Sequence, residues 1–278
     1  MINRSPLLAG VTAVLLLVGG GAWWYGSGPG GGDTDTDTDE LLPLPPIPPR
    51  IAEGADYERC LSMLNADPAG ARAFADAWVA TGGGDGAAHC LALATIQLGE
   101  PGDGAELLDT LANHSSAPAT ARASVYGQAG QAWLMAGDAA RALGSTTLAL
   151  SLAPDDVDLL IDRSIASGTL EHYDDVVEDV SRALELDPRR ADALVFRSVA
   201  HRQLGHLDRA QDDVDRAVGL DPDNPDALLE RGIQRQLRGD RSGARKDWER
   251  SAALSPDTAT GDLAQQNLAL LDAGPERR

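Results

Sequence analysis

The hydrophobic and polar positions from about residue 123 to residue 258 repeat with a period of 34 residues. Each unit ends in leucine, one variable residue and proline, and the four prolines are Pro154, Pro188, Pro222 and Pro256. Small or compact residues recur in three columns at the same period, namely Gly130, Ser164, Ser198 and Gly232; Ala142, Val176, Ala210 and Ala244; and Ala149, Ala183, Ala217 and Ser251. This pattern predicts pairs of helices that stack closely through small side chains.

The pattern resembles the tetratricopeptide repeat (TPR) family. The resemblance implies an all-α fold, a right-handed superhelix of helix–turn–helix units. The four regular units are 123–156, 157–190, 191–224 and 225–258, with a glycine or polar turn between the two helices of each. The second unit lacks glycine at this turn and carries Gly168 earlier, so we expect its first helix to fray or to end early.

The segments beside the regular units also have a helical pattern. Residues 56–122 carry apolar residues at three- and four-residue spacing, which predicts divergent helical-hairpin repeats. Within them, Pro68 is placed to start a helix that runs to about Ala80. Residues 259–273 predict a last helix, so 259–278 is interpreted as a capping helix and tail that cover the exposed end of the solenoid.

The N-terminal segment 1–25 predicts a membrane anchor. It contains about 20 consecutive uncharged residues, enough to span a bilayer core as a helix. Arg4 precedes them and no basic residue follows until Arg50, which favours the N-terminus inside and the remainder outside. We therefore expect a single pass through a bacterial inner membrane with the C-terminal domain in the periplasm, or alternatively a cleaved signal sequence. The Gly-, Asp- and Pro-rich residues 26–55 predict a disordered linker.

Composition narrows the choice of partners. The formal net charge is −20, so phosphates of nucleic acids and anionic lipid headgroups would repel the chain, and no nucleic-acid partner is expected. Aromatic residues make up 4% of the sequence, which favours thin helices packed through small side chains over a sheet of aromatic and β-branched residues.

The two cysteines, Cys60 and Cys90, fall in the first helices of successive predicted hairpins. First helices of neighbouring repeats lie side by side, so a disulfide can form and, in an oxidising periplasm, would stabilise the weakest end of the stack. The alternative is two buried thiols that never meet. A metal site built from His89 and the cysteines lacks a fourth ligand, so no metal is expected.

Two further columns predict structural ion pairs. Arginine occupies the seventh position of three units, and aspartate follows 16 residues later in each. The predicted pairs are Arg163 with Asp179, Arg197 with Asp213, and Arg231 with Asp247. The first regular unit has Ala129 and Ser145 at these positions, so it lacks both partners together, as a pairing rule requires.

By the resemblance, binding is expected on the concave surface formed by the first helices. The fifth and ninth positions of three consecutive units are apolar and, being four residues apart, share one helix face. The candidate groove residues are Ile161, Ile165, Val195, Val199, Leu229 and Ile233, with Arg202, Gln203 and Gln236 beside them and Asp158, Asp192 and Asp226 at the edge. Such a groove suits an extended peptide or amphipathic helix with apolar anchors and positive flanks. The alternative is that helix packing buries the stripe. The family's Lys/Asn clamp for a C-terminal carboxylate is missing from the corresponding positions.

No catalytic motif accompanies these repeats: the sequence has no Gly-x-Ser-x-Gly, phosphate loop or His-Glu-x-x-His. We therefore predict a non-enzymatic protein-interaction module without a cofactor, an assembly or scaffolding factor of the cell envelope. Two alternatives stay open. The chain could associate with itself through the apolar stripe, or it could hold apocytochrome peptides during c-type cytochrome biogenesis.

Overall fold

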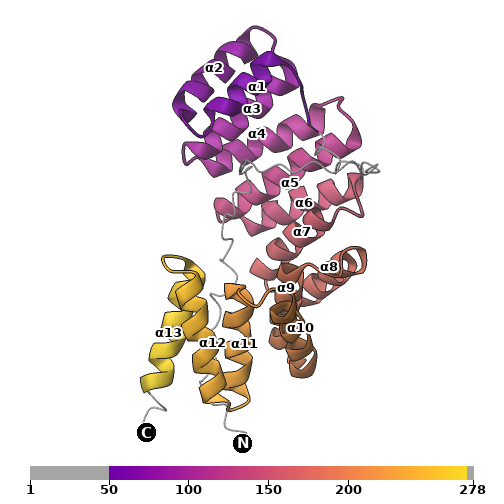
Figure 1. Cartoon of the computed structure of the whole chain (residues 1–278). Helices are drawn as coiled ribbons and strands as arrows, with labels where there is room; N and C mark the ends of the chain where they lie inside the picture. Colours follow the sequence, from indigo (N-terminus) through magenta and orange to yellow (C-terminus); the bar gives the residue numbers. More distant parts are fainter. Residues whose placement is uncertain (1–49, 274–278) are drawn as a thin grey trace, which may run out of the picture.

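The chain folds into a curved stack of helices that runs from α1 at one end to α13 at the other (Figure 1). The structure is a computed structural model, and it describes residues 50–273, which contain thirteen α-helices and no strand. Their bounds are α1 Ala55–Met63, α2 Pro68–Ala80, α3 Gly84–Gln97, α4 Pro101–His114, α5 Ala119–Met135, α6 Ala139–Leu152, α7 Val157–Thr169, α8 Tyr173–Leu186, α9 Ala191–Gln203, α10 Leu207–Leu220, α11 Pro225–Leu237, α12 Arg241–Leu254 and α13 Ala259–Ala273.

Each helix packs against the next along the chain, and first helices of successive units also touch. α5 contacts α7, α7 contacts α9, and α9 contacts α11. Local sequence fixes several of the helix starts. Pro68, Pro101 and Pro225 occupy the first turn of α2, α4 and α11, where the missing N–H costs no hydrogen bond. The Asp156 carboxylate caps α7 by accepting from the backbone N–H groups of Asp158 and Leu159 at 3.0 and 3.1 Å.

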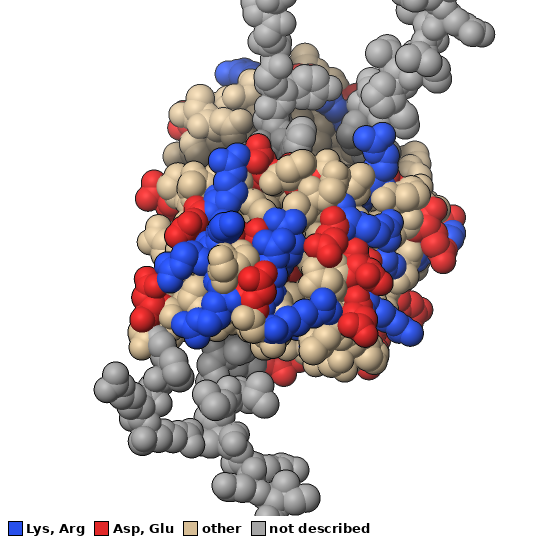
Figure 2. All heavy atoms as spheres, turned by 60° about the horizontal axis from the view of Figure 1, so that its bottom comes forward, with Lys and Arg blue, Asp and Glu red and all other residues tan. Residues whose placement is uncertain are grey.

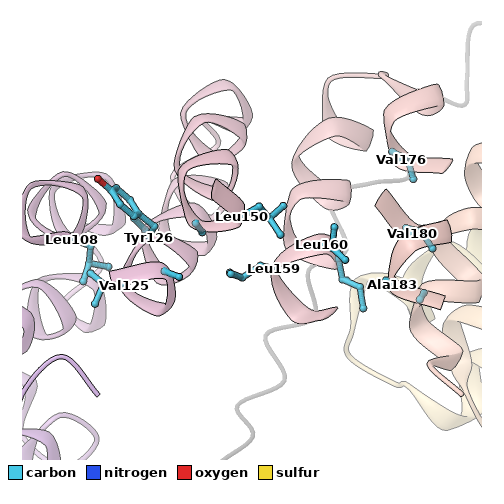
Figure 3. Close-up of a cluster of buried hydrophobic side chains, with 14 of the residues drawn as sticks. Leu108, Val125, Tyr126, Leu150, Leu159, Leu160, Val176, Val180 and Ala183 are labelled. Carbon is cyan, nitrogen blue, oxygen red and sulfur yellow. The ribbon is translucent and has the colours of Figure 1, made fainter. Parts of the chain in front are cut away.

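Small residues of the repeat pattern lie where two helices approach most closely. A Cβ atom at Gly232 in α11 would lie 2.3 Å from the indole nitrogen of Trp248 in α12, so no larger residue fits without movement. The core is continuous across the boundaries between units. Leu150 of α6 and Leu159 of α7 lie between the buried side chains of α4 and α5 and those of α8, such as Val180 (Figure 3). Each unit is therefore stabilised by its neighbours.

The turn of the second regular unit corrects an expectation. α7 runs to Thr169 and has the same 13-residue length as α9 and α11, so it does not end early. Glu171 adopts the left-handed conformation, with φ of 62°, that glycine adopts in the other units. The corresponding φ values are 78° at Gly137, 79° at Gly205 and 85° at Gly239. Packing in the unit outweighs the local preference of a residue that carries a Cβ atom.

Replacing Glu171 with glycine is expected to stabilise the protein by about 0.5–1 kcal/mol. Removal of the Cβ atom relieves about 1–2 kcal/mol of left-handed strain, and the larger entropy of glycine in the unfolded chain offsets part of this gain. Chemical denaturation of the two proteins measures the difference. Glu171→Ala is the control, because it removes the carboxylate but keeps the Cβ atom; a gain in alanine equal to that in glycine would contradict the backbone explanation.

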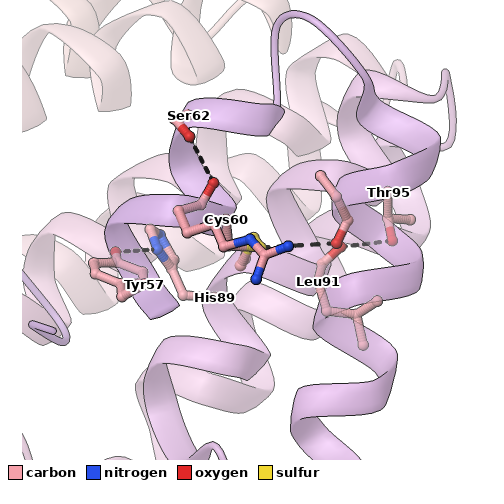
Figure 4. Close-up of a disulfide and its surroundings, with 9 residues drawn as sticks. Tyr57, Cys60, Ser62, His89, Leu91 and Thr95 are labelled. Carbon is pink, nitrogen blue, oxygen red and sulfur yellow. Dashed lines mark hydrogen bonds between the residues drawn. A yellow bond between two sulfur atoms is a disulfide. The ribbon is translucent and has the colours of Figure 1, made fainter. Parts of the chain in front are cut away.

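The N-terminal end of the stack is closed by a disulfide. Cys60 in α1 and Cys90 in α3 are bonded, and both side chains are fully buried (Figure 4). Ordered structure also begins within the predicted linker, since Ile51 is buried against this end and α1 starts at Ala55. The sequence pattern did not predict this ordered start, because one apolar residue after a proline-rich run has no periodicity.

Other boundaries also differ from the sequence pattern or fall outside the structure. α5 begins at Ala119, ahead of the unit boundary predicted at residue 123. The predicted anchor 1–25, linker residues 26–49 and the tail 274–278 lie outside the described residues. Among the helices of residues 50–273, none is long and apolar enough to cross a membrane.

Candidate partner-binding groove

A pocket of about 90 Å³ opens where three successive first helices, α7, α9 and α11, lie side by side. Its walls are apolar, and the residues at its edge are polar or acidic. The lining residues are Ile165 from α7; Asp192, Val195, Phe196 and Val199 from α9; and Asn224, Asp226, Leu229, Glu230 and Ile233 at the start of and along α11. The volume suits a single large apolar side chain of a bound molecule.

The pocket contains part of the predicted stripe. Ile165, Val195, Val199, Leu229 and Ile233 line it, whereas Ile161 is buried in the main core and takes no part. Among the lining residues, Ile165 and Ile233 are half-buried, while the other three are largely covered by neighbouring helices. Helix packing therefore buries part of the apolar stripe, as the alternative in the sequence analysis held. The apolar surface open to a ligand is smaller than the sequence pattern indicates.

The predicted polar residues of the groove are placed differently. Arg202 is not presented to a ligand, because its guanidinium is buried and donates to Glu230 at 2.7 and 3.1 Å. Gln203 and Gln236 are half-buried and do not line the pocket. Gln234, on the same helix as Glu230, donates to that carboxylate at 3.0 Å and extends this buried network. The cation expected to face the groove instead neutralises an acid within its wall.

Three lining residues were missed by sequence reasoning. Phe196 and Glu230 occupy the sixth position of their units, and Asn224 precedes α11, where its side chain accepts from the N–H of Ala227 at 2.9 Å. Phe196 lies three residues before Val199, so helical spacing alone places both on one face. That signal was available, whereas the inward position of Glu230 depends on its pairing with Arg202 across two helices.

An acidic rim follows the starts of the three helices. It consists of Asp158, Asp192 and Asp226, which hold the second position of their units. Arg190 bonds Asp158 at 2.6 Å and Asp192 at 2.8 and 3.0 Å. Burial favours the neutral acid at Asp192, but the hydrogen bonds from Arg190 outweigh it and hold the pKa of this carboxyl below its usual value. Asp192 is therefore ionised at neutral pH, and a concentration of acidic side chains along the rim would attract a cationic ligand.

The predicted Arg–Asp pairs are all present in the structure and link the two helices of their units. Arg163 bonds Asp179 at 2.8 and 2.5 Å, Arg197 bonds Asp213 at 2.8 and 2.7 Å, and Arg231 bonds Asp247 at 2.9 and 2.8 Å. The aspartates are buried, so these are structural contacts.

The first regular unit replaces this pair with contacts to the unit before it. Ser145 and the indole N–H of Trp133 both donate to Asp109 of α4, each at 2.8 Å.

The charges on the surface are of both signs. On the face at the bottom of Figure 1, arginines alternate with acidic side chains (Figure 2). Separately, the side chains of Arg250 and Asp223 form an ion pair at 2.7 Å.

A polar chain connects the first helices at the N-terminal end. Tyr57 and His89 are hydrogen-bonded at 2.6 Å (Figure 4), and His89 in turn contacts Gln128 at 2.6 Å. Burial lowers the pKa of the His89 imidazole and raises the pKa of Tyr57 to about 12, so both are neutral at physiological pH. Their role is structural, and within residues 50–273 no group of three or more His, Cys, Asp or Glu side chains is arranged to hold a metal ion.

Replacing Asp162 with asparagine is expected to raise the melting temperature at about pH 7.5 and to have little effect at about pH 4.5. Burial raises the pKa of this carboxyl to about 6, although Gln131 donates to it at 2.9 Å. Since the folded pKa lies above the unfolded value, the ionised acid destabilises the fold above pH 6, and the wild type gains stability as pH falls from 6 towards 4. Thermal unfolding across this range tests it. The exposed control Glu178→Gln should follow the wild type, and parallel profiles for Asp162→Asn and wild type would contradict the assignment.

Comparisons with known proteins define the fold. No protein-family model matches the sequence, and the comparison with curated proteins finds no match. Solved structures do match. MamA 41-end from Desulfovibrio magneticus RS-1 is 16% identical with a TM-score of 0.52, and the match covers 74% of this chain and 100% of that chain. YrrB, described as a TPR protein with an unusual peptide-binding site, is 19% identical with a TM-score of 0.50, covering 66% of this chain and 91% of that one.

A third similar structure is a chain of the APC/C hetero-tetramer Cut9–Hcn1, 16% identical with a TM-score of 0.57. That match covers 77% of this chain and 42% of the other. At such identities the similarity concerns the fold alone. The described part of the chain is a TPR-like α-solenoid, which confirms the predicted all-α class.

Proposed function

We propose that this chain is a protein-interaction module that holds a segment of a partner protein in the pocket between α7, α9 and α11. The observation that carries the proposal is the pocket of about 90 Å³. Apolar side chains from three successive first helices line it, and an acidic rim lies beside it. YrrB, whose fold this chain resembles, is described as having an unusual peptide-binding site. A peptide or an amphipathic helix with apolar anchors fits such a groove.

The cellular role that we propose is assembly or scaffolding in a bacterial envelope. In this proposal residues 1–25 hold the protein in the inner membrane, and the repeats face the periplasm, where the anchor raises their effective concentration near membrane complexes. A disulfide between Cys60 and Cys90 supports an oxidising compartment. We assign the protein no catalytic step and no cofactor.

The proposal is tested by affinity capture of the full-length protein after crosslinking in membranes. The variant is Ile165→Asp/Ile233→Asp, because these two lining side chains are half-buried and can carry a charge with the least damage to the fold. Leu148→Asp is the matched control, since Leu148 is 49% exposed and does not line the pocket. Circular dichroism checks that both proteins fold.

We expect a specific partner captured by the wild type and by Leu148→Asp, and lost from the folded groove variant. Equal capture by all three proteins would refute binding in this pocket. Capture of the chain by itself, lost in the same variant, would instead favour the self-association hypothesis.

A further inference from the structure

Beside the acidic rim, the last position of the unit is arginine in one unit and asparagine in the next. Arg190 precedes α9 and bridges two units, since it donates to Asp158 of α7 and to Asp192 of α9 at 2.6–3.0 Å. One unit later the same position is Asn224, which precedes α11 and lies between Asp192 and Asp226 in the sequence of the rim. Arg190 thus holds a cation between Asp158 and Asp192 of two neighbouring units. In the next gap, between Asp192 and Asp226, the same position supplies no cation.

Asn224 does not replace the missing charge. It is neutral, and its side-chain oxygen is used to cap α11 by accepting from the N–H of Ala227. Asp226 accepts a hydrogen bond from the hydroxyl of Thr260 at 2.6 Å, and among the described residues no arginine or lysine bonds it. A carboxylate has about four acceptor sites, so both Asp192 and Asp226 retain sites for another donor.

This gap coincides with the edge of the apolar pocket, because Asp192, Asn224 and Asp226 all line it. Val195 and Leu229 follow the two aspartates by one turn of their helices, so the rim and the apolar wall are adjacent. A ligand that carries a cation and a large apolar group a few ångströms apart would satisfy both features at once.

We propose that the groove recognises a partner peptide in which an arginine or lysine lies close to a large apolar residue, with the cation bridging Asp192 and Asp226 as Arg190 bridges Asp158 and Asp192. This inference rests on the proposed function and specifies the ligand of the same pocket. Arginine is the better fit, because its planar fork donates to two carboxylates at once. Charge complementarity selects the occupant: within residues 50–273, the ion pairs of the four acids Asp158, Asp192, Asp226 and Glu230 are made with two arginines, Arg190 and Arg202.

Selection of random peptides displayed on phage, against the immobilised full-length protein, identifies the probe. We expect the enriched sequences to contain Arg or Lys within one helical turn of Leu, Ile, Met or Phe. The best sequence is then synthesised with a fluorophore, and its affinity is measured by fluorescence polarisation. Replacing the basic residue of the probe with glutamine should weaken binding by roughly ten-fold or more, and added salt should weaken the parent probe.

Two variants of the protein separate the cation site from the apolar pocket. Asn224→Arg supplies the missing cation from the chain itself and should weaken the parent probe by roughly ten-fold or more. The fold accommodates arginine at this position, since Arg190 immediately precedes α9 and makes no side-chain cap there. Asp226→Asn should have a similar effect. Arg182→Asn is the matched control: Arg182 bonds Asp155 and Glu185 outside the pocket, so its loss should keep the affinity of the probe.

The outcomes distinguish this inference from the proposed function. Peptides that lose binding in Ile165→Asp/Ile233→Asp but bind Asn224→Arg and Asp226→Asn as the wild type would overturn the cation bridge and leave the peptide groove in place. Enriched peptides without a basic residue would do the same. If no peptide is enriched over the bare support, both proposals fail. Light scattering adds a control for the occupant, because a wild-type dimer that dissociates in Asn224→Arg would identify a second copy and overturn the peptide assignment.

Discussion

Replacing Arg202 with methionine is expected to lower the free energy of unfolding by about 3–5 kcal/mol. The substitution leaves Glu230 as an unpaired acid inside the wall between α9 and α11, where its side chain is only 3% exposed. The lost attraction matters less than the cost of this isolated charge, because its burial leaves it little hydration. Denaturation by urea, followed by circular dichroism, measures the loss.

The double variant Arg202→Met/Glu230→Leu is the control for this prediction. Removing both charges removes the unpaired acid, so the double variant should recover most of the stability that the single variant loses. Gln234 keeps a partner in the double variant, because it also donates to the hydroxyl of Ser198 at 2.7 Å. A double variant as unstable as Arg202→Met would show that packing around the pair, and not its charge, accounts for the loss.

Replacing both Cys60 and Cys90 with alanine is expected to destabilise the N-terminal end of the stack by about 3–4 kcal/mol. The bond closes a loop with a sequence separation of 30 residues, and its removal restores the entropy of this loop in the unfolded chain. α1 packs mainly on α2 and α3, so it has few other contacts to retain it. Hydrogen exchange of the backbone amides should accelerate in α1 and α2.

The regular units provide the control within the same molecule. Because stability in a solenoid is largely a sum of units and their interfaces, amides of α9 to α12 should exchange at the wild-type rate. Uniform acceleration along the whole stack would contradict a local role for the disulfide. Equal exchange in α1 with and without the cysteines would mean that packing alone holds this end.

Periodicity explains which parts of the structure could be predicted. Arg163 and Asp179 recur with the same spacing in two further units, so their pairing was visible as two columns that change together. Arg202 and Glu230 pair once only, because the equivalent positions hold Gly168 and Phe196 in the preceding unit. A contact made once produces no repeated column in the sequence. Arg202 was therefore interpreted as a free cation beside the groove.

Exposure along the groove could not be read from the sequence for a different reason. Ile161 and Ile165 share a helix face, yet Ile161 is buried in the core and Ile165 lines the pocket, so the spacing of apolar residues does not fix how far neighbouring helices cover each one. Backbone strain was also hidden. Glycine predicts a left-handed turn, but Glu171 adopts one because the units on both sides fix the path of the chain.

The most direct test of the central claim, that the pocket between α7, α9 and α11 holds a partner protein, is site-specific photocrosslinking in living cells. A photoreactive phenylalanine analogue replaces Ile233, which lines the pocket, or Leu148, which is exposed elsewhere. We predict an adduct with one partner from position 233 and none with that partner from position 148. Adding Asn224→Arg to the protein with the analogue at position 233 should weaken this adduct. Identical adducts from both positions, or adducts from position 148 alone, would contradict binding in the groove.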